Sequence, residues 1–210
     1  MRIRSDDFAP MQPIPDEFAF GKPGANGEPV VFAPNRNPHL AWSDVPGGTR
    51  SFALICVDTD VPTRGDDVNK PGRHVSASLP RTAFFHWVMV DIPVECRELG
   101  AGSCAEGVVE RGKQDPHGPP GAKQGINDFT GWFASDAAMS GDYYGYDGPC
   151  PPWNDDLLHH YHFHVYALDL PTLGLSGRFT AADARAAMQG HVLAEAEIIG
   201  TYTLHAALRR

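Results

Sequence analysis

A chain of 210 residues is long enough to bury one generous hydrophobic core and too short for two comfortable ones, so we expect a single domain over residues 1–210. Its 17 basic and 26 acidic residues give a formal net charge of −9, which argues against nucleic acid or anionic membrane surfaces as main partners. This charge leaves open the binding of a small anion inside a pocket. The 22 glycines and 19 prolines follow no repeat, and with 42% hydrophobic residues they favour a loop-rich β protein over disorder.

The compartment is predicted from the first residues and from the cysteines. Residues 1–8, MRIRSDDF, contain no apolar h-region, so we expect no secretory signal, and no apolar run approaches the length of a membrane span. The four cysteines form no CxxC pair and are expected to be thiols rather than a disulfide framework: Cys56, Cys96, Cys104 and Cys150. We therefore expect a cytoplasmic protein that does not insert into membranes.

Short apolar runs, rich in aromatic and β-branched residues, dominate the chain and predict buried strands. In chain order these are Val30–Phe32, Ser51–Asp58, Phe84–Ile92, Tyr161–Leu168 and a strand within Glu195–Leu204. Two long irregular connections lie between them, Pro62–Thr82 and Arg111–Trp153. Loops of that length in a compact domain are usually functional or carry minor secondary structure.

Helix signals come late in the chain. Thr180 is a suitable N-cap, the residues after it are rich in alanine, and Gly190 can end the helix. A second helical turn is predicted over Val192–Ala196. Many strands, long loops and short C-terminal helices together indicate a mainly β fold, either a β-sandwich or a Greek key.

Two candidate segments for chemistry lie in predicted strands. In Asp58-Thr-Asp60-Val-Pro62, two carboxylates at i and i+2 share a face if the strand continues, although Asp and Pro are also common where strands simply stop. His86 lies inside an apolar strand, where a histidine is more often a satisfied core or surface residue than a ligand. Each segment alone is compatible with an ordinary structural role.

The most informative segment runs from Gly148 to Leu170. Its prolines fix φ and lack an N–H, so the loop cannot relax into helix or sheet before the strand that follows. Because side chains alternate along a strand, one face carries His159, Tyr161, Phe163 and Val165, and the other carries His160, His162 and His164. The first face changes from polar to apolar, as a strand does when it runs from the lip of a pocket into a core.

Taken in order, these motifs resemble the phosphatidylethanolamine-binding protein family, and most closely its bacterial, Raf-kinase-inhibitor-like branch. The resemblance rests on Asp58-x-Asp60-x-Pro62, on His86-Trp-Val followed by Asp91-Ile-Pro93, and on Gly148-x-x-Pro151-Pro152 leading to His159-x-Tyr161-x-Phe163. It implies a β-sandwich with Greek-key topology, one small cavity at the end of the sheets, and short helices near the C-terminus.

The resemblance also implies a ligand site. The residues that match the family's anion pocket are Asp58, His86, Pro151, Pro152, His159 and Tyr161, with Asp60 as a second acid closer to a structural role. Eukaryotic relatives accept a phosphate-bearing headgroup such as phosphoethanolamine there. A tyrosine hydroxyl, imidazole N–H groups and loop N–H groups can hold a phosphate without Lys or Arg. Asp58 would fix a histidine tautomer or face a ligand ammonium, and we expect anion binding to strengthen as the histidines become protonated.

The chain departs from the family pattern in several places. His160 stands where the family usually has Arg between the last His and the Tyr, so the expected lock on the loop is weaker and pH-dependent. Segments 64–82 and 121–146 are long, and the aromatic residues of the second either wall the cavity or pack the loop onto the sandwich: Phe129, Trp132, Phe133, Tyr143, Tyr144 and Tyr146. Cys150 is expected to be a small buried residue rather than a redox thiol.

Other function classes stay open. His86, His159 and Tyr161 with an acid can be written as an acid–base set, as in a hydrolase, but without a nucleophile elbow, glycine-rich phosphate loop or HExxH motif we predict no enzyme. Alternate strand histidines supply only two neighbouring metal ligands, because i to i+4 spans about 13 Å, so we assign no metal and no cofactor. A protein-interaction module of the kinase-inhibitor kind is the main alternative. The resemblance also implies a homodimer, which size-exclusion chromatography tests.

Overall fold

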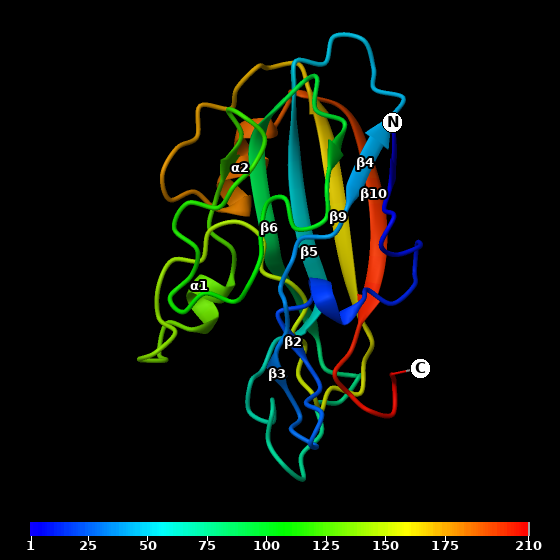
Figure 1. The fold of residues 1–210 in the computed structure, drawn as a ribbon, viewed down its shortest axis with the longest axis vertical. Coiled ribbons are helices and arrows are strands. Elements are labelled where there is room, and N and C mark those ends of the chain that lie inside the picture. The colour runs from blue at the N-terminus through cyan, green and yellow to red at the C-terminus, as the bar shows by residue number, and fades with distance from the viewer. Residues whose placement is uncertain (210) are drawn as a thin grey trace.

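Five antiparallel strands form the largest sheet in residues 1–209, the part of the chain that the computed structural model describes. Their order is β10-β9-β5-β6-β8, and the four long strands lie side by side along the long axis of the molecule (Figure 1). Their bounds are β5 (Ser51–Pro62), β6 (Arg81–Pro93), β8 (Lys123–Gln124), β9 (His159–Leu168) and β10 (Val192–Tyr202).

The remaining elements are short. A three-stranded sheet has the order β1-β4-β7, and β2 pairs with β3 as a separate two-stranded sheet. The bounds are β1 (Arg2–Arg4), β2 (Gly21–Lys22), β3 (Val31–Phe32), β4 (Leu40–Ser43), β7 (Glu98–Leu99), the 3-10 helix η1 (Asp16–Phe18), α1 (Phe129–Trp132) and α2 (Ala181–Met188). Within residues 1–209, none of the helices has the length and apolar character needed to cross a membrane.

The large sheet has a Greek-key arrangement. Strands β5, β6 and β8 are neighbours in that order, and β9 returns to lie on the free side of β5. The spatial order β9-β5-β6-β8 is therefore the 4-1-2-3 order that defines a Greek key. The predicted mainly β, Greek-key sandwich is confirmed, and the five predicted strands correspond to β3, β5, β6, β9 and β10.

The main hydrophobic core lies between the large sheet and the β1-β4-β7 sheet. Leu40 and Trp42 of β4 pack there against Phe52 of β5, Trp87 of β6 and Phe163 of β9. Along β9 the inward residues alternate with half-buried ones, as the sequence pattern predicts. His159 and Tyr161 therefore enter the inner face at one end of the strand, where the core begins.

The other face of the large sheet is covered in part by α2. Thr180 caps this helix: its hydroxyl accepts from the Asp183 N–H, and the Asp183 carboxylate accepts from the Thr180 N–H, a reciprocal capping box. Buried Ala181, Ala184 and Met188 belong to the smaller core on this face. The single helix near the C-terminus within residues 1–209 is thus where the sequence predicts it, and Figure 1 places it beside β6.

The predicted helical turn over Val192–Ala196 is wrong. These residues form the start of β10, which pairs with β9 from Val192 to Tyr202. The segment Leu-Ala-Glu-Ala-Glu has good helix propensity, but propensity is a weak preference that sheet pairing overrides. Ala196 and Ile198 point into the core while Glu195 and Glu197 are exposed, so the strand period of two is satisfied.

Candidate functional site

A cavity of about 140 Å³ lies at the end of the large sheet where β5 ends and β9 begins. It gathers six of the seven candidate residues into its wall: Asp58, His86, Pro151, Pro152, His159 and Tyr161. Asp60 is the exception. Its carboxylate faces His160 instead, accepting from both the backbone N–H and the Nδ1 of that residue at 2.8 Å.

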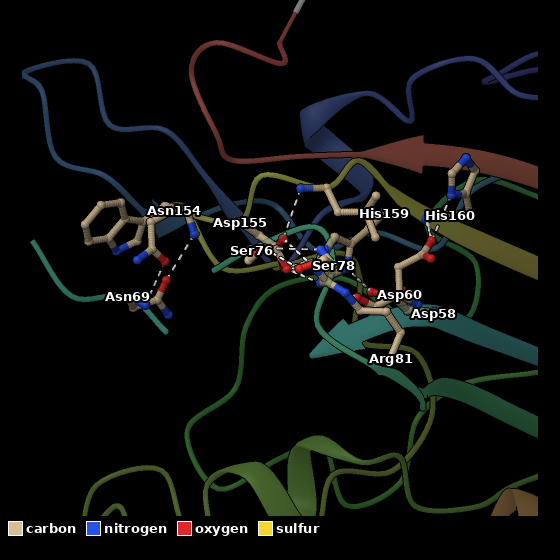
Figure 2. A network of polar contacts seen from close by, with 12 residues as sticks. Asp58, Asp60, Asn69, Ser76, Ser78, Arg81, Asn154, Asp155, His159 and His160 are labelled. Atoms are coloured by element: carbon tan, nitrogen blue, oxygen red, sulfur yellow. Dashed lines mark hydrogen bonds and ion pairs between the residues drawn. The ribbon is translucent and has the colours of Figure 1, made fainter. Parts of the chain in front are cut away.

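His159 is fully buried and lies between two carboxylates. Its Nδ1 donates to Asp58 Oδ2 at 2.7 Å, and its Nε2 donates to Asp155 Oδ2 at 3.1 Å (Figure 2). Both ring nitrogens therefore carry protons, and the residue is an imidazolium. Burial alone would lower the pKa of His159, but the hydrogen bonds to Asp155 and Asp58 outweigh it and raise the pKa to about 9.

The chain of charges continues to Arg81, the first residue of β6. Its two terminal nitrogens donate to the Asp155 carboxylate at 2.6 and 3.0 Å, a bidentate pair. They also donate to the carbonyls of Asp60 and Ser76 at 2.8 Å each. Asp58, His159, Asp155 and Arg81 thus alternate in sign, and the buried network carries no net charge.

Sequence reasoning missed both Asp155 and Arg81. Neither lies in a motif, and they meet only because β6 begins beside the loop that precedes β9, as Figure 2 shows. The expected lock on that loop therefore comes from Arg81 rather than from His160. The sequence offered one indication of the Asp155–His159 contact, namely that Asp155 lies only four residues before His159.

The long segment 63–80 is tied to the proline loop by two asparagines. The Asn154 amide donates to the carbonyls of Asp67 and Arg73 at 2.8 and 3.0 Å. The Asn154 side-chain oxygen accepts from the Asn69 N–H at 2.9 Å (Figure 2). The Asn69 side-chain oxygen accepts from the Trp153 N–H at 3.0 Å. The segment is thus a support for the proline loop, and Val68 and Asn69 also line the cavity.

His86 reaches the cavity from β6 and is anchored from behind. Its Nδ1 donates to the Asp147 carbonyl oxygen at 2.7 Å, which fixes the tautomer because a carbonyl can only accept. Its Nε2 atom makes no hydrogen bond to another group among residues 1–209. Burial lowers the pKa of His86 against the opposing pull of Asp58, so the ring is neutral near pH 7.

The anchor for His86 is itself a buried network that the sequence did not indicate. The Asp147 carboxylate is fully buried and accepts from Lys113 Nζ at 2.5 Å, Asn35 Nδ2 at 2.7 Å and Asn127 Nδ2 at 2.9 Å. Next to it, Gly148 passes so close to the chain at Phe18 that an added Cβ would lie 2.0 Å from the Phe18 carbonyl oxygen. Only glycine fits there, which accounts for the first residue of the proline motif.

Tyr161 contributes the most unusual polar atom of the site. Its side chain is fully buried in the cavity wall, and its hydroxyl has no hydrogen-bond partner among residues 1–209. Its ring meets the His86 ring edge to face at 5.2 Å. Burial, with the Asp58 carboxylate nearby, raises the pKa of Tyr161 well above its usual value, so the hydroxyl keeps its proton and is a donor.

Aromatic residues form much of the remaining cavity wall, beside the polar residues Asp58, His86 and Tyr161. Phe20, Phe84, Phe129, Trp132 and Phe133 line it, and Phe20 stacks on Phe129 with ring centroids 4.5 Å apart. The aromatic residues of segment 121–146 thus divide between the two predicted roles. Phe129, Trp132 and Phe133 wall the cavity, whereas Tyr143 and Tyr146 are buried behind it with their hydroxyls bonded to backbone carbonyls.

Comparisons with known proteins agree with this architecture. The family described as phosphatidylethanolamine-binding protein matches residues 4–203. The UPF0098 protein of Aquifex aeolicus is 36% identical over 188 residues, covering 87% of this chain and 86% of that protein. YbhB, a UPF0098 protein of Escherichia coli, is 29% identical over 203 residues, covering 97% of this chain and 100% of that protein.

Solved structures give the same result. Escherichia coli YbcL is described as a new member of the mammalian PEBP (phosphatidylethanolamine-binding protein) family. It superposes with a TM-score of 0.68 at 28% identity, covering 96% of this chain and 97% of that one. The PEBP homologue CT736 of Chlamydia trachomatis gives a TM-score of 0.61 at 27% identity, covering 96% and 95%. The chain belongs to the phosphatidylethanolamine-binding protein family.

Proposed function

We propose that this protein binds a small anionic ligand, of the class of a phosphorylated headgroup such as phosphoethanolamine, in the cavity at the end of the large sheet. The observation that carries the proposal is the Tyr161 hydroxyl, a buried donor in the cavity wall with no protein partner among residues 1–209. Leaving such a group without a hydrogen bond costs about 1–3 kcal/mol. A ligand oxygen that accepts from the hydroxyl removes this cost, which favours binding.

Two groups make direct contact with the anion in this proposal. The Tyr161 O–H donates to one oxygen. His86 Nε2 accepts a hydrogen bond from a protonated anion when the ring is neutral, and donates a hydrogen bond when the ring is charged. His159 lines the cavity, but both of its ring nitrogens are bonded to carboxylates. Its role is therefore to hold Asp58 and the proline loop in place rather than to donate to the ligand.

The cavity limits the size and character of the ligand. Sites for drug-sized molecules occupy about 300–1,000 Å³, whereas this cavity holds about 140 Å³. It suits a headgroup rather than a whole lipid. Its largely aromatic wall favours an apolar group next to the anion. The polar residues of the wall are little exposed, with His86 at 3% and Asp58 at 1%, so a bound anion would be largely shielded from water.

Two described cavity residues, Cys150 and His159, are unsuited to catalysis. Cys150 is the one cysteine among the described residues that line the cavity. Burial raises the pKa of its thiol to about 12, so the thiol is not a thiolate nucleophile at neutral pH. His159 cannot act as a general base, because both nitrogens already carry protons. We therefore expect a binding protein rather than a hydrolase.

Replacing Tyr161 with Phe tests the proposal, since it removes only the unpartnered hydroxyl. We expect isothermal titration calorimetry with phosphoethanolamine to show at least a tenfold loss of affinity, because a hydrogen bond to a charged group contributes roughly 1.5–3 kcal/mol. Urea unfolding of the ligand-free variant should show equal or higher stability than wild type, because a buried unsatisfied group is removed.

Tyr166→Phe is the matched control, because Tyr166 lies on the opposite face of the same strand and outside the cavity. It should bind phosphoethanolamine as wild type does. Equal affinity of wild type and Tyr161→Phe would contradict the proposed contact. No binding to wild type at millimolar phosphoethanolamine would contradict the ligand class.

A further inference from the structure

A second polar cluster lies on the outer face of the large sheet, away from the cavity. His162 and His164 are two residues apart on β9 and so share a face, and Glu197 of β10 is the direct cross-strand partner of His164. We call these three residues the β9–β10 cluster. Their side chains are 21%, 16% and 37% exposed, respectively, so they are reachable from solvent yet held between strands.

The atoms of the β9–β10 cluster converge on one point. Glu197 Oε1 lies 2.7 Å from His162 Nδ1 and 3.3 Å from His164 Nε2, and one ligand atom from each residue lies within 4.8 Å of the others. The arrangement presents two imidazole nitrogens and one carboxylate oxygen to the same small volume. This donor set, two His and one Glu, is one that Zn²⁺ and Fe²⁺ accept in open sites.

Each histidine of the cluster is also held through its other nitrogen. His164 Nδ1 lies 2.6 Å from Glu195 Oε1, and His162 Nε2 lies 3.3 Å from the Thr59 hydroxyl. Metal-binding histidines typically donate their second N–H to a carboxylate, a backbone carbonyl or water, and the Glu195 carboxylate has this position beside His164. Here these contacts point His164 Nε2 and His162 Nδ1 at Glu197.

We propose that the β9–β10 cluster binds a divalent transition-metal ion such as Zn²⁺. The ligands are His162 Nδ1, His164 Nε2 and Glu197, and water takes the remaining position. Glu195 acts as a positioning residue through His164. The sequence predicts no metal, because alternate histidines supply two ligands and the third comes from a strand whose pairing with β9 is visible only in the fold. The proposal is independent of the cavity and its ligand.

A competing cluster shows why this site is favoured. His74, Asp156 and His205 also approach one another, with His74 Nδ1 and His205 Nε2 at 3.4 and 3.8 Å from Asp156 Oδ1. The His74 side chain is 71% exposed, and all three residues lie outside the helices and strands. Ligands on paired strands are positioned more precisely than ligands on loops. The loop cluster therefore serves as the internal control.

Calorimetric titration of the full chain, first stripped of metal with EDTA, tests the proposal with Zn²⁺ as the probe. Wild type should bind one Zn²⁺ at this site. Loss of the positioning residue in Glu195→Gln should weaken Zn²⁺ binding by about tenfold. Loss of a direct ligand in Glu197→Gln or His164→Phe should weaken Zn²⁺ binding by more than about tenfold. His74→Gln should bind as wild type does, and circular dichroism should show that all variants are folded.

The comparison between variants decides the outcome. Equal Zn²⁺ affinity in wild type, Glu197→Gln and His164→Phe would overturn the proposal, and so would loss of binding in His74→Gln alone. Absence of Zn²⁺ binding to wild type would overturn it as well. Glu197→Gln keeps the shape of the side chain and lies on the surface, so an effect on Zn²⁺ binding cannot be attributed to misfolding.

Discussion

Asp155→Asn is expected to lower the free energy of unfolding by about 3–5 kcal/mol at neutral pH, the cost of breaking a buried ion pair by removing one partner. Asp155 is 1% exposed and accepts from Arg81 on one side and from His159 on the other. Asparagine keeps the shape but removes the negative charge that lies between the two cations, so Arg81 and the His159 imidazolium lose the carboxylate that they share. Urea unfolding measures the change.

Asp169→Asn is the matched control. Asp169 pairs with His191 at 2.9 Å, but the two side chains are 44% and 40% exposed. An exposed pair of this kind contributes about 0–1 kcal/mol, so the control should lose no more than that. If Asp155→Asn lost as little as Asp169→Asn, the buried network would not be what holds the proline loop.

Stability should also fall as pH rises from about 6.5 to about 9, because of His159. The folded state holds the pKa of His159 at about 9, whereas an unfolded histidine has a pKa of about 6.5. A raised pKa contributes stability that is complete below the unfolded value and is lost as pH rises through the folded value. At about 1.4 kcal/mol per pKa unit, the difference between the folded and unfolded pKa values corresponds to about 3 kcal/mol of unfolding free energy.

Urea unfolding of wild type and His159→Gln across this pH range isolates the effect, because other titrating groups are common to both proteins. The advantage of wild type over the variant should shrink as pH increases through about 9. A difference that stays constant over the whole range would contradict a charged His159. Direct observation of the His159 ring by nitrogen-15 NMR would show the same proton lost near the same pH.

The sequence predicted the long elements well because their signals are local. The apolar runs around Phe52, Trp87 and Phe163 are buried strands, and the alternation along β9 separates cavity from outer face. Five of the strands were not predicted, β1, β2, β4, β7 and β8, because each has two to four residues and is defined by its partner strand. The start of β10 was predicted wrongly for the same reason, since its partner decides its conformation.

The site was predictable only in part. The motifs named the residues of the cavity wall, but charge pairs between distant segments leave no pattern in the chain. Arg81 meets Asp155, and Lys113 meets Asp147, only after the sheet has formed. His159 uses both ring nitrogens for Asp58 and Asp155, so we propose a structural role for it in place of the expected role as a ligand donor. His86 is then the cavity histidine with a ring nitrogen left to meet a ligand.

The central claim, an anion held by Tyr161 and His86, is tested most directly by nitrogen-15 NMR of the histidine rings during titration with phosphoethanolamine. Because burial lowers the pKa of His86, the ring gains its second proton only below about pH 6.5, and Nε2–H then donates to the anion. The spectra are therefore compared at about pH 7.5 and at the lower pH at which the ring resonances show His86 to be charged. Sulfate is the control ligand, because the second phosphate pKa of about 6 falls within this range.

We predict that the His86 Nε2 resonance shifts saturably with either ligand, that sulfate binds more tightly at the lower pH, and that the exposed His191 does not respond. A His86 resonance that stays unchanged while phosphoethanolamine binds, or sulfate affinity that is equal at both pH values, would contradict the account.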